Sequence, residues 1–430
     1  MHLVNASEPP AGRPFQSTPS HLNLVFTLRL INTQTYELEE IFHDIPPYAI
    51  LSHTWGSEEV TFREYLLATG PDASKYTHIK RKSGFSKILG ACKRARGDGL
   101  QFLWCDTNCI DKRSSAELGE AINSMYAWYR DSAICYAYLA DVNIVSGLGP
   151  SVPFEKSRWL TRGWTLQELL APKEVRFFDF RWVELGDRDQ LADVISKATR
   201  IHIGALRDRD TIPNYSIAQR MSWAADRQTS RREDIAYCLL GIFDVNMPLL
   251  YGEGRNSFLR LQEEIMKSSD DLSILAWDVF DDNCRHRSGA FTNTPNSFRF
   301  CGSIIRDPEI GRSRYSMTNI GLSLRLPIMR TLVDGLFAAG LNCCLELHSS
   351  RSVASPGQGT STIRKRFQVW IWLRSSNTGV FERTHTPTSK TFFKQSYTSA
   401  CALTRKFLYP NDGHRHTIYA IAYSHITRQL

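Results

Sequence analysis

The run Tyr48-Ala49-Ile50-Leu51-Ser52-His53 decides the fold of the first half of the chain. Its four apolar residues come after a Pro-Pro pair and give way to polar Ser52 and His53. This pattern predicts a buried strand whose carboxyl end opens into a loop. Three similar runs lie at 100–105, 133–139 and 175–178, and each is expected to form another strand.

Helical patterns separate these runs. Residues 86–96 place apolar side chains on one face and end at a Gly-Asp-Gly stop, and residues 117–130 repeat apolar positions at helical spacing behind a Ser114/Glu117 capping box. A shorter helix is expected at 162–170. The alternation predicts an α/β fold, a flavodoxin-like parallel sheet flanked by helices, with function at the carboxyl ends of the strands.

The rest of the chain divides by pattern. Residues 1–27 form a Pro-rich leader, 28–200 the sheet domain, 201–277 a helical extension, and 278–430 a C-terminal β-rich domain. Alternating apolar residues predict strands in the last domain, and a Gly- and Pro-containing stretch predicts a loop between two of them. The expected strands lie at 322–326, 341–347, 367–373 and 418–423, and the loop at 349–362.

Composition supports a folded chain with an uneven charge. The 430 residues are 42% hydrophobic and 22% charged, as in ordinary globular proteins. The net charge is +8, but residues 278–430 carry +11 and the first 277 residues carry −3. This step marks a domain boundary near Trp277. The basic residues are dispersed, so a solvated basic face is favoured over a nucleic-acid site.

Neither a membrane span nor a resident metal is expected. The apolar stretch at 22–31 is broken by polar residues, and the segment before it lacks the features of a signal peptide. The ten cysteines lie mostly in apolar runs, as reduced thiols of a cytoplasmic protein do. Cys105 and Cys109 are spaced C-x3-C without a second ligand pair, which favours core thiols over a zinc site.

Missing motifs exclude several enzyme classes. The chain has no G-x-x-x-x-G-K-[ST] loop, no G-x-G-x-x-G, no G-x-S-x-G elbow and no H-E-x-x-H. P-loop NTPases, Rossmann dehydrogenases, serine hydrolases and zinc proteases are therefore not supported. No bound cofactor is expected.

Three segments together carry a family resemblance: 51–56 (LSHTWG), 103–111 (LWCDTNCID) and 162–170 (RGWTLQELL). In this order, on a strand-helix background, they resemble the HET (heterokaryon incompatibility) domain of fungal self/non-self recognition proteins. Residues 231–237 and 248–254 resemble segments that lie C-terminal to the HET domain in many of these proteins. The resemblance implies an effector that triggers programmed cell death.

A more distant resemblance, to TIR domains, implies a mechanism. Plant TIR domains open with an apolar strand ending in Leu-Ser, here Leu51-Ser52, and carry a Trp-Cys-Leu-x-Glu-Leu helix, here residues 164–169 with Thr165 where Cys is usual. In NAD-cleaving TIR domains the Glu of that helix is catalytic. The resemblance therefore makes Glu168 the catalytic candidate and NAD a substrate.

The chemistry of N-glycosidic cleavage agrees with a single carboxylate. The reaction passes through an oxocarbenium-like ribose that a carboxylate stabilises, and nicotinamide leaves from a cationic ring without a general acid. Polar and aromatic residues at the strand ends and beside Glu168 are candidates for binding NAD: Ser52, His53, Trp55, Gly56, Asp106, Asn108 and Trp164.

Each candidate also has a structural alternative. Glu168 is also compatible with an ion pair to Arg162 or Lys173 on a solvated helix. Trp164 is also compatible with a core position, and Asp106 and Asn108 with capping of a turn. Cys109 is not favoured as a nucleophile because no His is adjacent in sequence.

Two functions remain open. The first is an incompatibility effector that acts by NAD glycohydrolysis. The alternative is a non-enzymatic death-signalling module that self-assembles through the HET domain and recruits partners. The sequence shows no nucleotide-binding motif or repeat sensor, so activation is expected from a protein activator or from homo-oligomer formation.

Overall fold

The computed structural model describes residues 28–144, 152–279, 289–307, 315–319, 321–330, 334–351, 361–375 and 381–384. The expected leader at 1–27 and the expected strand at 418–423 lie outside these residues, as do Cys284 and Cys401.

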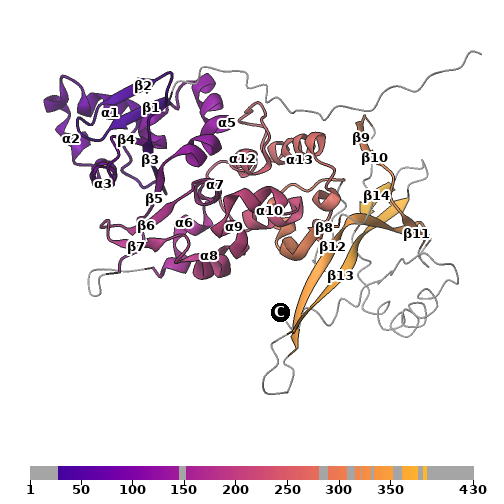
Figure 1. Ribbon diagram of the computed structural model, residues 1–430. Coiled ribbons are helices and arrows are strands. Elements are labelled where there is room, and N and C mark those ends of the chain that lie inside the picture. Colours follow the sequence, from indigo (N-terminus) through magenta and orange to yellow (C-terminus); the bar gives the residue numbers. More distant parts are fainter. Residues whose placement is uncertain are drawn as a thin grey trace, which may run out of the picture.

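The first unit is built on a seven-stranded sheet in the order β2-β1-β4-β3-β5-β6-β7 (Figure 1). Its four central strands are parallel, as expected, and correspond to the four apolar runs. The outer strands pair antiparallel, so the sheet is mixed. The sequence did not predict these strands because each has only four or five residues, and two of them are half-exposed. The strands are β1 (Leu28–Asn32), β2 (Leu38–Ile41), β3 (Tyr48–His53), β4 (Phe102–Cys105), β5 (Ile134–Leu139), β6 (Val175–Asp179) and β7 (Glu184–Asp187).

Strand β3 is longer than the sequence indicated. Ser52 and His53 were expected in a loop, but they are the last two residues of the strand, and both are buried. They stay in the strand because His53 pairs with Tyr138 of β5 and Ser52 pairs with Ala137. Successive strand residues point to opposite faces, so these two neighbours serve different sides of the sheet.

The helices of this unit confirm the expected pattern, with two corrections. Ser114 accepts a hydrogen bond from the backbone of Glu117, but the Glu117 carboxylate contacts Arg29 and the backbone of Asp111, so the capping box is only half formed. The helix expected at 162–170 begins only at Thr165, and a separate short helix that was not expected precedes it at Arg158–Thr161. The helices are α1 (Phe62–Thr69), α2 (Thr77–Lys80), α3 (Ser83–Gly97), α4 (Asp106–Cys109), α5 (Ser115–Asp131), α6 (Arg158–Thr161) and α7 (Thr165–Leu170).

The helical extension packs on the sheet unit, with α12 against α5 (Figure 1). After α10, the buried Arg227 donates hydrogen bonds to the backbone oxygen of Arg162 and to Thr165 Oγ1, so the extension holds the start of α7. The helices are α8 (Ala192–Thr199), α9 (Ile203–Arg207), α10 (Ile217–Ala224), α11 (Asp234–Tyr237), α12 (Leu240–Phe243) and α13 (Asn256–Ser268). The short 3-10 turns are η1 (Ala73–Tyr76), η2 (Phe154–Lys156), η3 (Arg209–Asn214), η4 (Leu272–Leu275), η5 (Pro295–Phe298) and η6 (Cys301–Ser303).

The C-terminal region is antiparallel, as its alternating pattern predicts, and its main feature is the long hairpin β12–β13. The loop expected at 349–362 is shorter than predicted, because Ser349–Arg351 pair with Ser361–Ile363 inside the hairpin. The strands are β8 (Ile304–Arg306), β9 (Tyr315–Thr318), β10 (Gly321–Leu324), β11 (Ile328–Arg330), β12 (Leu336–Arg351), β13 (Ser361–Ser375) and β14 (Phe381–Thr384).

One apolar core runs from β1 to β13. Ser216, at the start of α10, donates a 2.5 Å hydrogen bond to the backbone oxygen of Ile304 in β8, which ties the helical extension to the strand region. The domain limits drawn from composition stay predictions. Among the described residues, no helix is long and apolar enough to cross a membrane.

Candidate functional site

The end of β3 organises two groups of polar side chains, one on each face of the sheet. Ser52 faces α6 and α7, whereas His53 faces α3. Both groups lie at the carboxyl edge of parallel strands, where function was expected.

On the first face, Ser52 and Glu168 form a buried hydrogen-bonded pair. The Ser52 hydroxyl donates to Glu168 Oε2 and accepts from Trp159 Nε1 at 2.8 Å. Trp159 is itself fully buried and packs edge-on against Phe177. The serine hydroxyl is therefore fixed in direction, and it holds the carboxyl group in one orientation.

Burial dominates the electrostatics of Glu168. The residue is 7% exposed, and burial raises its pKa to about 7, with the nearby charge of Asp106 adding to the rise and the Ser52 hydrogen bond opposing it. In the part of the chain that the structure describes, Glu168 forms no ion pair. A carboxyl group with a pKa near neutrality is poised to exchange protons at physiological pH.

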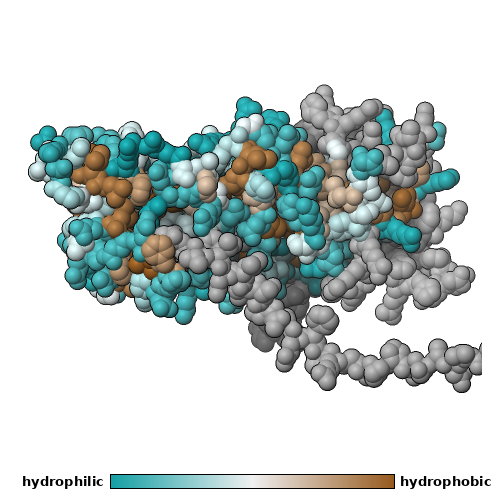
Figure 2. Space-filling view, turned by 90° about the horizontal axis from the view of Figure 1, so that it is seen from above, coloured by the Kyte–Doolittle hydropathy of each residue, from teal (hydrophilic) through white to brown (hydrophobic). Residues whose placement is uncertain are grey.

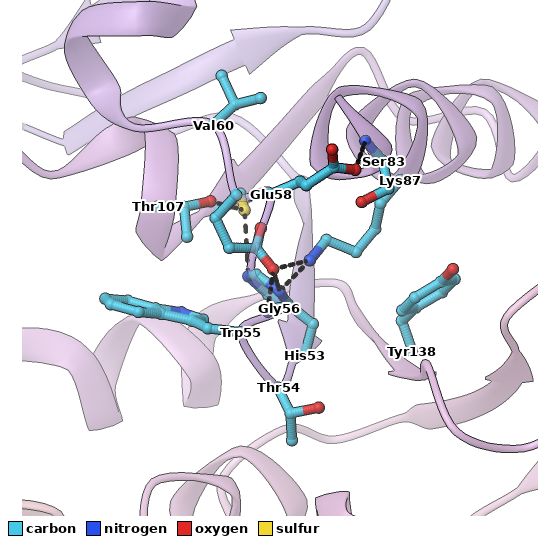
Figure 3. Close-up of polar contacts among 12 residues, drawn as sticks. His53, Thr54, Trp55, Gly56, Glu58, Val60, Ser83, Lys87, Thr107 and Tyr138 are labelled. Carbon is cyan, nitrogen blue, oxygen red and sulfur yellow. Dashed lines mark hydrogen bonds and ion pairs between the residues drawn. The ribbon is translucent and has the colours of Figure 1, made fainter. Parts of the chain in front are cut away.

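On the second face, His53 lies between two carboxylates and a lysine. Figure 3 shows Lys87 reaching from α3 toward His53, with Trp55 on the opposite side. Lys87 Nζ lies 2.6 Å from His53 Nδ1 and 2.6 Å from Glu59 Oε1, and His53 Nε2 lies 3.1 Å from Asp106 Oδ1. Two donors cannot face each other at 2.6 Å, so one proton occupies the line between His53 Nδ1 and Lys87.

Fixed charges characterise this second group. Although burial by itself raises the pKa of Glu59, contacts with His53 and Lys87 lower it to about 2. Burial also raises the pKa of Asp106. The charges and hydrogen bonds of Lys112 and His53 outweigh burial and hold the pKa of Asp106 well below its ordinary range. Burial and Lys87 lower the pKa of His53, while Cys105 and Asp106 raise it, and the net direction is upward. The one positive charge that His53 and Lys87 share thus lies between two ionised carboxylates.

Trp55 links this group to solvent. Its ring is 49% exposed, its Nε1 donates to Asp106 Oδ2 at 3.1 Å, and Lys112 Nζ lies 3.5 Å from the ring centroid. Arg158 donates to Thr54 Oγ1 and to the backbone oxygen of Trp55. An exposed aromatic ring flanked by cations is suited to a nucleotide, whose base stacks and whose phosphates are negative.

The remaining predicted site residues have other surroundings. The Gly56 N–H donates to Glu59 Oε1 at 2.8 Å, and the fully buried Asn108 donates to the backbone oxygen of Val60 at 2.7 Å. Trp164 precedes α7 and lies beside Asp234, whose pKa is raised by burial and lowered in part by hydrogen bonds that include one from Trp164. The structure thus pairs Ser52 with Glu168 on one face of the sheet and groups His53, Trp55, Gly56 and Asp106 on the other. Asn108 and Trp164 make other contacts.

Comparison with known proteins identifies the segment around these residues. Residues 48–151 match the family described as Heterokaryon incompatibility protein (HET). The chain is also 47% identical over 239 residues to the Vegetative incompatibility protein HET-E-1 of Podospora anserina. This chain carries a HET domain. The second match covers 54% of this chain and 17% of that relative's length, and no solved structure matches.

The HET match confirms the resemblance seen in the sequence, and it contains Ser52, His53, Trp55, Gly56, Asp106 and Asn108. Glu168 and Trp164 lie beyond residue 151. The carboxylate that faces Ser52 therefore comes from a helix outside the matched HET segment.

Three members of the two groups were not predicted from the sequence: Glu59, Lys87 and Trp159. A signal for Lys87 was present, because Lys87, Ala91 and Ala95 lie on one helical face and the two alanines are fully buried. A lysine on the apolar stripe of a helix requires a buried partner. No comparable signal marks Trp159, since a tryptophan in an apolar helix is ordinarily a core residue.

The described residues contain one group with metal-ligand chemistry. His53, Cys105 and Asp106 each present a ligand atom, and these atoms lie within 4.8 Å of one another. The sequence analysis expected no metal and treated Cys105 as a core thiol.

Proposed function

We propose that this chain is an effector of vegetative incompatibility, which triggers programmed cell death in self/non-self recognition. The HET domain and the 47% identity to a protein named for vegetative incompatibility support this function. Because the match covers 17% of that relative, the proposal concerns the effector unit and not the relative's other regions.

The proposed mechanism is hydrolysis of the N-glycosidic bond of NAD, with Glu168 as the key carboxylate. The single observation that carries it is the buried Ser52–Glu168 pair with a pKa near 7. The parallel strands β4-β3-β5-β6 follow the 2-1-3-4 order of flavodoxin-like sheets, which supports the TIR-like fold that suggested this chemistry.

The pair is suited to the reaction in two respects. The ionised carboxylate stabilises positive charge on the ribose, and the Ser52 hydroxyl keeps it oriented without neutralising it by an ion pair. At 7% exposure, Glu168 meets a substrate only after α6 or α7 shifts. Self-assembly through the HET domain, or a protein activator, supplies that shift in this proposal.

The alternative function is a non-enzymatic signalling module, and the burial of Glu168 favours it. That alternative also predicts an ion-paired Glu168 and an exposed apolar patch. Glu168 forms no ion pair among the described residues, and Figure 2 shows the apolar side chains of one face in separate groups divided by polar ones. NAD hydrolysis therefore keeps the stronger support. A cytoplasmic location remains the prediction from the reduced cysteines.

The test measures NAD consumption and nicotinamide release by the purified full chain, at high concentration with a crowding agent. Glu168→Gln keeps the size of the side chain and removes its charge. Glu155→Gln is the matched control, because Glu155 is an exposed glutamate in η2 of the same segment. We expect turnover by wild type and the control, and loss of at least about 100-fold in Glu168→Gln.

Two results would reject the enzyme. One is intact NAD with wild type while expression of the chain still kills cells. The other is equal NAD consumption by wild type and Glu168→Gln. Either result, together with undiminished killing by Glu168→Gln, makes the assembly module the better account.

A further inference from the structure

A second site lies on the His53 face of the sheet, and it does not involve Glu168. Strand register explains its geometry. Cys105 is the last residue of β4 and pairs with Leu51 of β3, and His53 lies two residues beyond Leu51 on the same face. Asp106 comes directly after Cys105 at the start of α4.

The three side chains converge with spacings that suit one small metal ion. His53 Nε2 lies 3.1 Å from Asp106 Oδ1 and 3.7 Å from Cys105 Sγ. In a tetrahedral zinc site, with metal–nitrogen and metal–oxygen distances of about 2.0 Å and metal–sulfur of about 2.3 Å, neighbouring ligand atoms lie about 3.3 to 3.6 Å apart. The observed separations approximate two edges of such a tetrahedron.

Neighbouring groups hold these ligands in place. Trp55 Nε1 and Lys112 Nζ each lie 3.1 Å from Asp106 Oδ2, which leaves Oδ1 directed at His53. Lys87 and Glu59 fix the far nitrogen of the imidazole. Second-shell contacts of this kind orient metal ligands in known sites.

We propose that His53, Cys105 and Asp106 bind a zinc ion through Nε2, Sγ and Oδ1. Binding releases one proton from the Cys105 thiol and one from His53 Nε2. The proton between His53 and Lys87 then resides on Nδ1, which donates it to the neutral amine of Lys87. Three protein ligands leave a fourth position for water. Asp106 is the partly exposed member of the set, so this position lies on its side.

The donor set excludes harder cations. Thiolate and imidazole favour zinc or cobalt over magnesium and calcium, which prefer oxygen ligands. The positive charge of Lys112 beside Asp106 reduces the affinity for a cation, and the Cys105 thiolate and the carboxylates of Asp106 and Glu59 offset this effect.

The test uses the full chain, freed of metal with a chelator and titrated with Co²⁺ as a spectroscopic substitute for Zn²⁺. We expect one equivalent of Co²⁺ to give a thiolate-to-cobalt charge-transfer band that Zn²⁺ abolishes by displacement. Cys105→Ala removes this band. Asp106→Asn keeps the thiolate and weakens binding by about 100-fold or more, since loss of even an outer-shell partner costs about 10- to 100-fold.

Two further variants separate this site from other thiols. Cys109→Ala tests the C-x3-C alternative, and Cys135→Ala is a control, because Cys135 is a fully buried thiol on the neighbouring strand β5. Both should keep the band. Lys112→Met should bind Co²⁺ several-fold more tightly, because it removes a positive charge beside Asp106.

The proposal fails if wild type shows no thiolate band at stoichiometric Co²⁺, or if Cys105→Ala keeps it. If Cys105→Ala does not fold, an Asp106→Asn variant that binds Co²⁺ as tightly as wild type is sufficient to overturn the proposed site. A band lost equally in Cys109→Ala assigns the metal to the C-x3-C pair instead.

Discussion

Ser52 and His53 are adjacent in sequence, yet their carboxylate partners behave in opposite ways. Glu168, bonded to Ser52, is buried and forms no ion pair among the described residues, and its pKa rises to about 7. Glu59, beside His53 and Lys87, is also largely buried, and its pKa falls to about 2. Burial raises the pKa in both cases, so the counter-charges decide the sign. One face of the strand thus holds a group that titrates near neutrality, and the other holds fixed charges.

The largest expected effect comes from removing the counter-charge. Lys87→Met leaves Glu59 without its lysine, and we expect the free energy of unfolding to fall by about 3 to 5 kcal/mol. Chemical denaturation followed by circular dichroism measures this. Lys75→Met is the control, because the Lys75–Asp72 pair is exposed and should contribute less than about 1 kcal/mol. An equal fall in the free energy of unfolding in the two variants would show that the buried Lys87–Glu59 pair contributes no more to stability than the exposed pair.

The second prediction concerns pH. The ordinary pKa of Glu168 is 4.5 and its folded value is about 7, so the folded chain holds a proton that the unfolded chain has lost. Its contribution to stability is complete below pH 4.5 and is lost as pH rises through 7. Between pH 4.5 and 8, we expect the free energy of unfolding of wild type to fall by about 3 kcal/mol relative to that of Glu168→Gln. Chemical denaturation at each pH measures this difference.

Glu59→Gln should show the reverse pH dependence. The folded pKa of Glu59 is about 2, so its contribution is present above pH 4.5 and is lost as pH falls toward 2. The free energy of unfolding of wild type should therefore approach that of Glu59→Gln as the pH falls toward 2. Parallel pH profiles for the two variants would contradict the contrast between the two faces.

A smaller effect is expected from Ser52→Ala. This change leaves Trp159 Nε1 and the Glu168 carboxyl group without their shared hydrogen-bond partner. We expect the free energy of unfolding to fall by about 2 kcal/mol. The pKa of Glu168 should rise further, because the serine hydrogen bond lowers it. Ser86→Ala on the exposed side of α3 is the control and should change stability by less than about 0.5 kcal/mol. If stability depends on pH in the same way in Ser52→Ala as in wild type, the Ser52 hydroxyl does not influence the pKa of Glu168.

The smallest effect on stability is expected at the exposed edge. Trp55→Ala removes a hydrogen bond to Asp106 and the contact with Lys112, so we expect the free energy of unfolding to fall by about 1 kcal/mol. The same variant should raise KM for NAD about tenfold, from the loss of stacking with a base. Phe300→Ala, another exposed aromatic, is the control and should leave KM unchanged. A normal KM in Trp55→Ala would remove Trp55 from the NAD site.

Several parts of this arrangement were predictable from local pattern. The four apolar runs became the four parallel strands because each is long and apolar enough to be buried on both faces. Ser52 and Glu168 were both candidates for the NAD site, and the structure places the two in contact. The outer strands and the helix at Arg158–Thr161 were not predicted, because segments of four or five residues carry little periodic signal.

The sequence by itself determined the α/β alternation, the β-rich C-terminal region and the HET signature, because these depend on local periodicity and on short motifs. Tertiary structure alone decided which face each site residue serves and which charges surround it. Strand register placed Cys105 beside His53, although 52 positions separate them in the chain. Helix α3 brought Lys87 to His53 across 34 positions. Charge compensation depends on distances across the fold, and no local pattern encodes those distances.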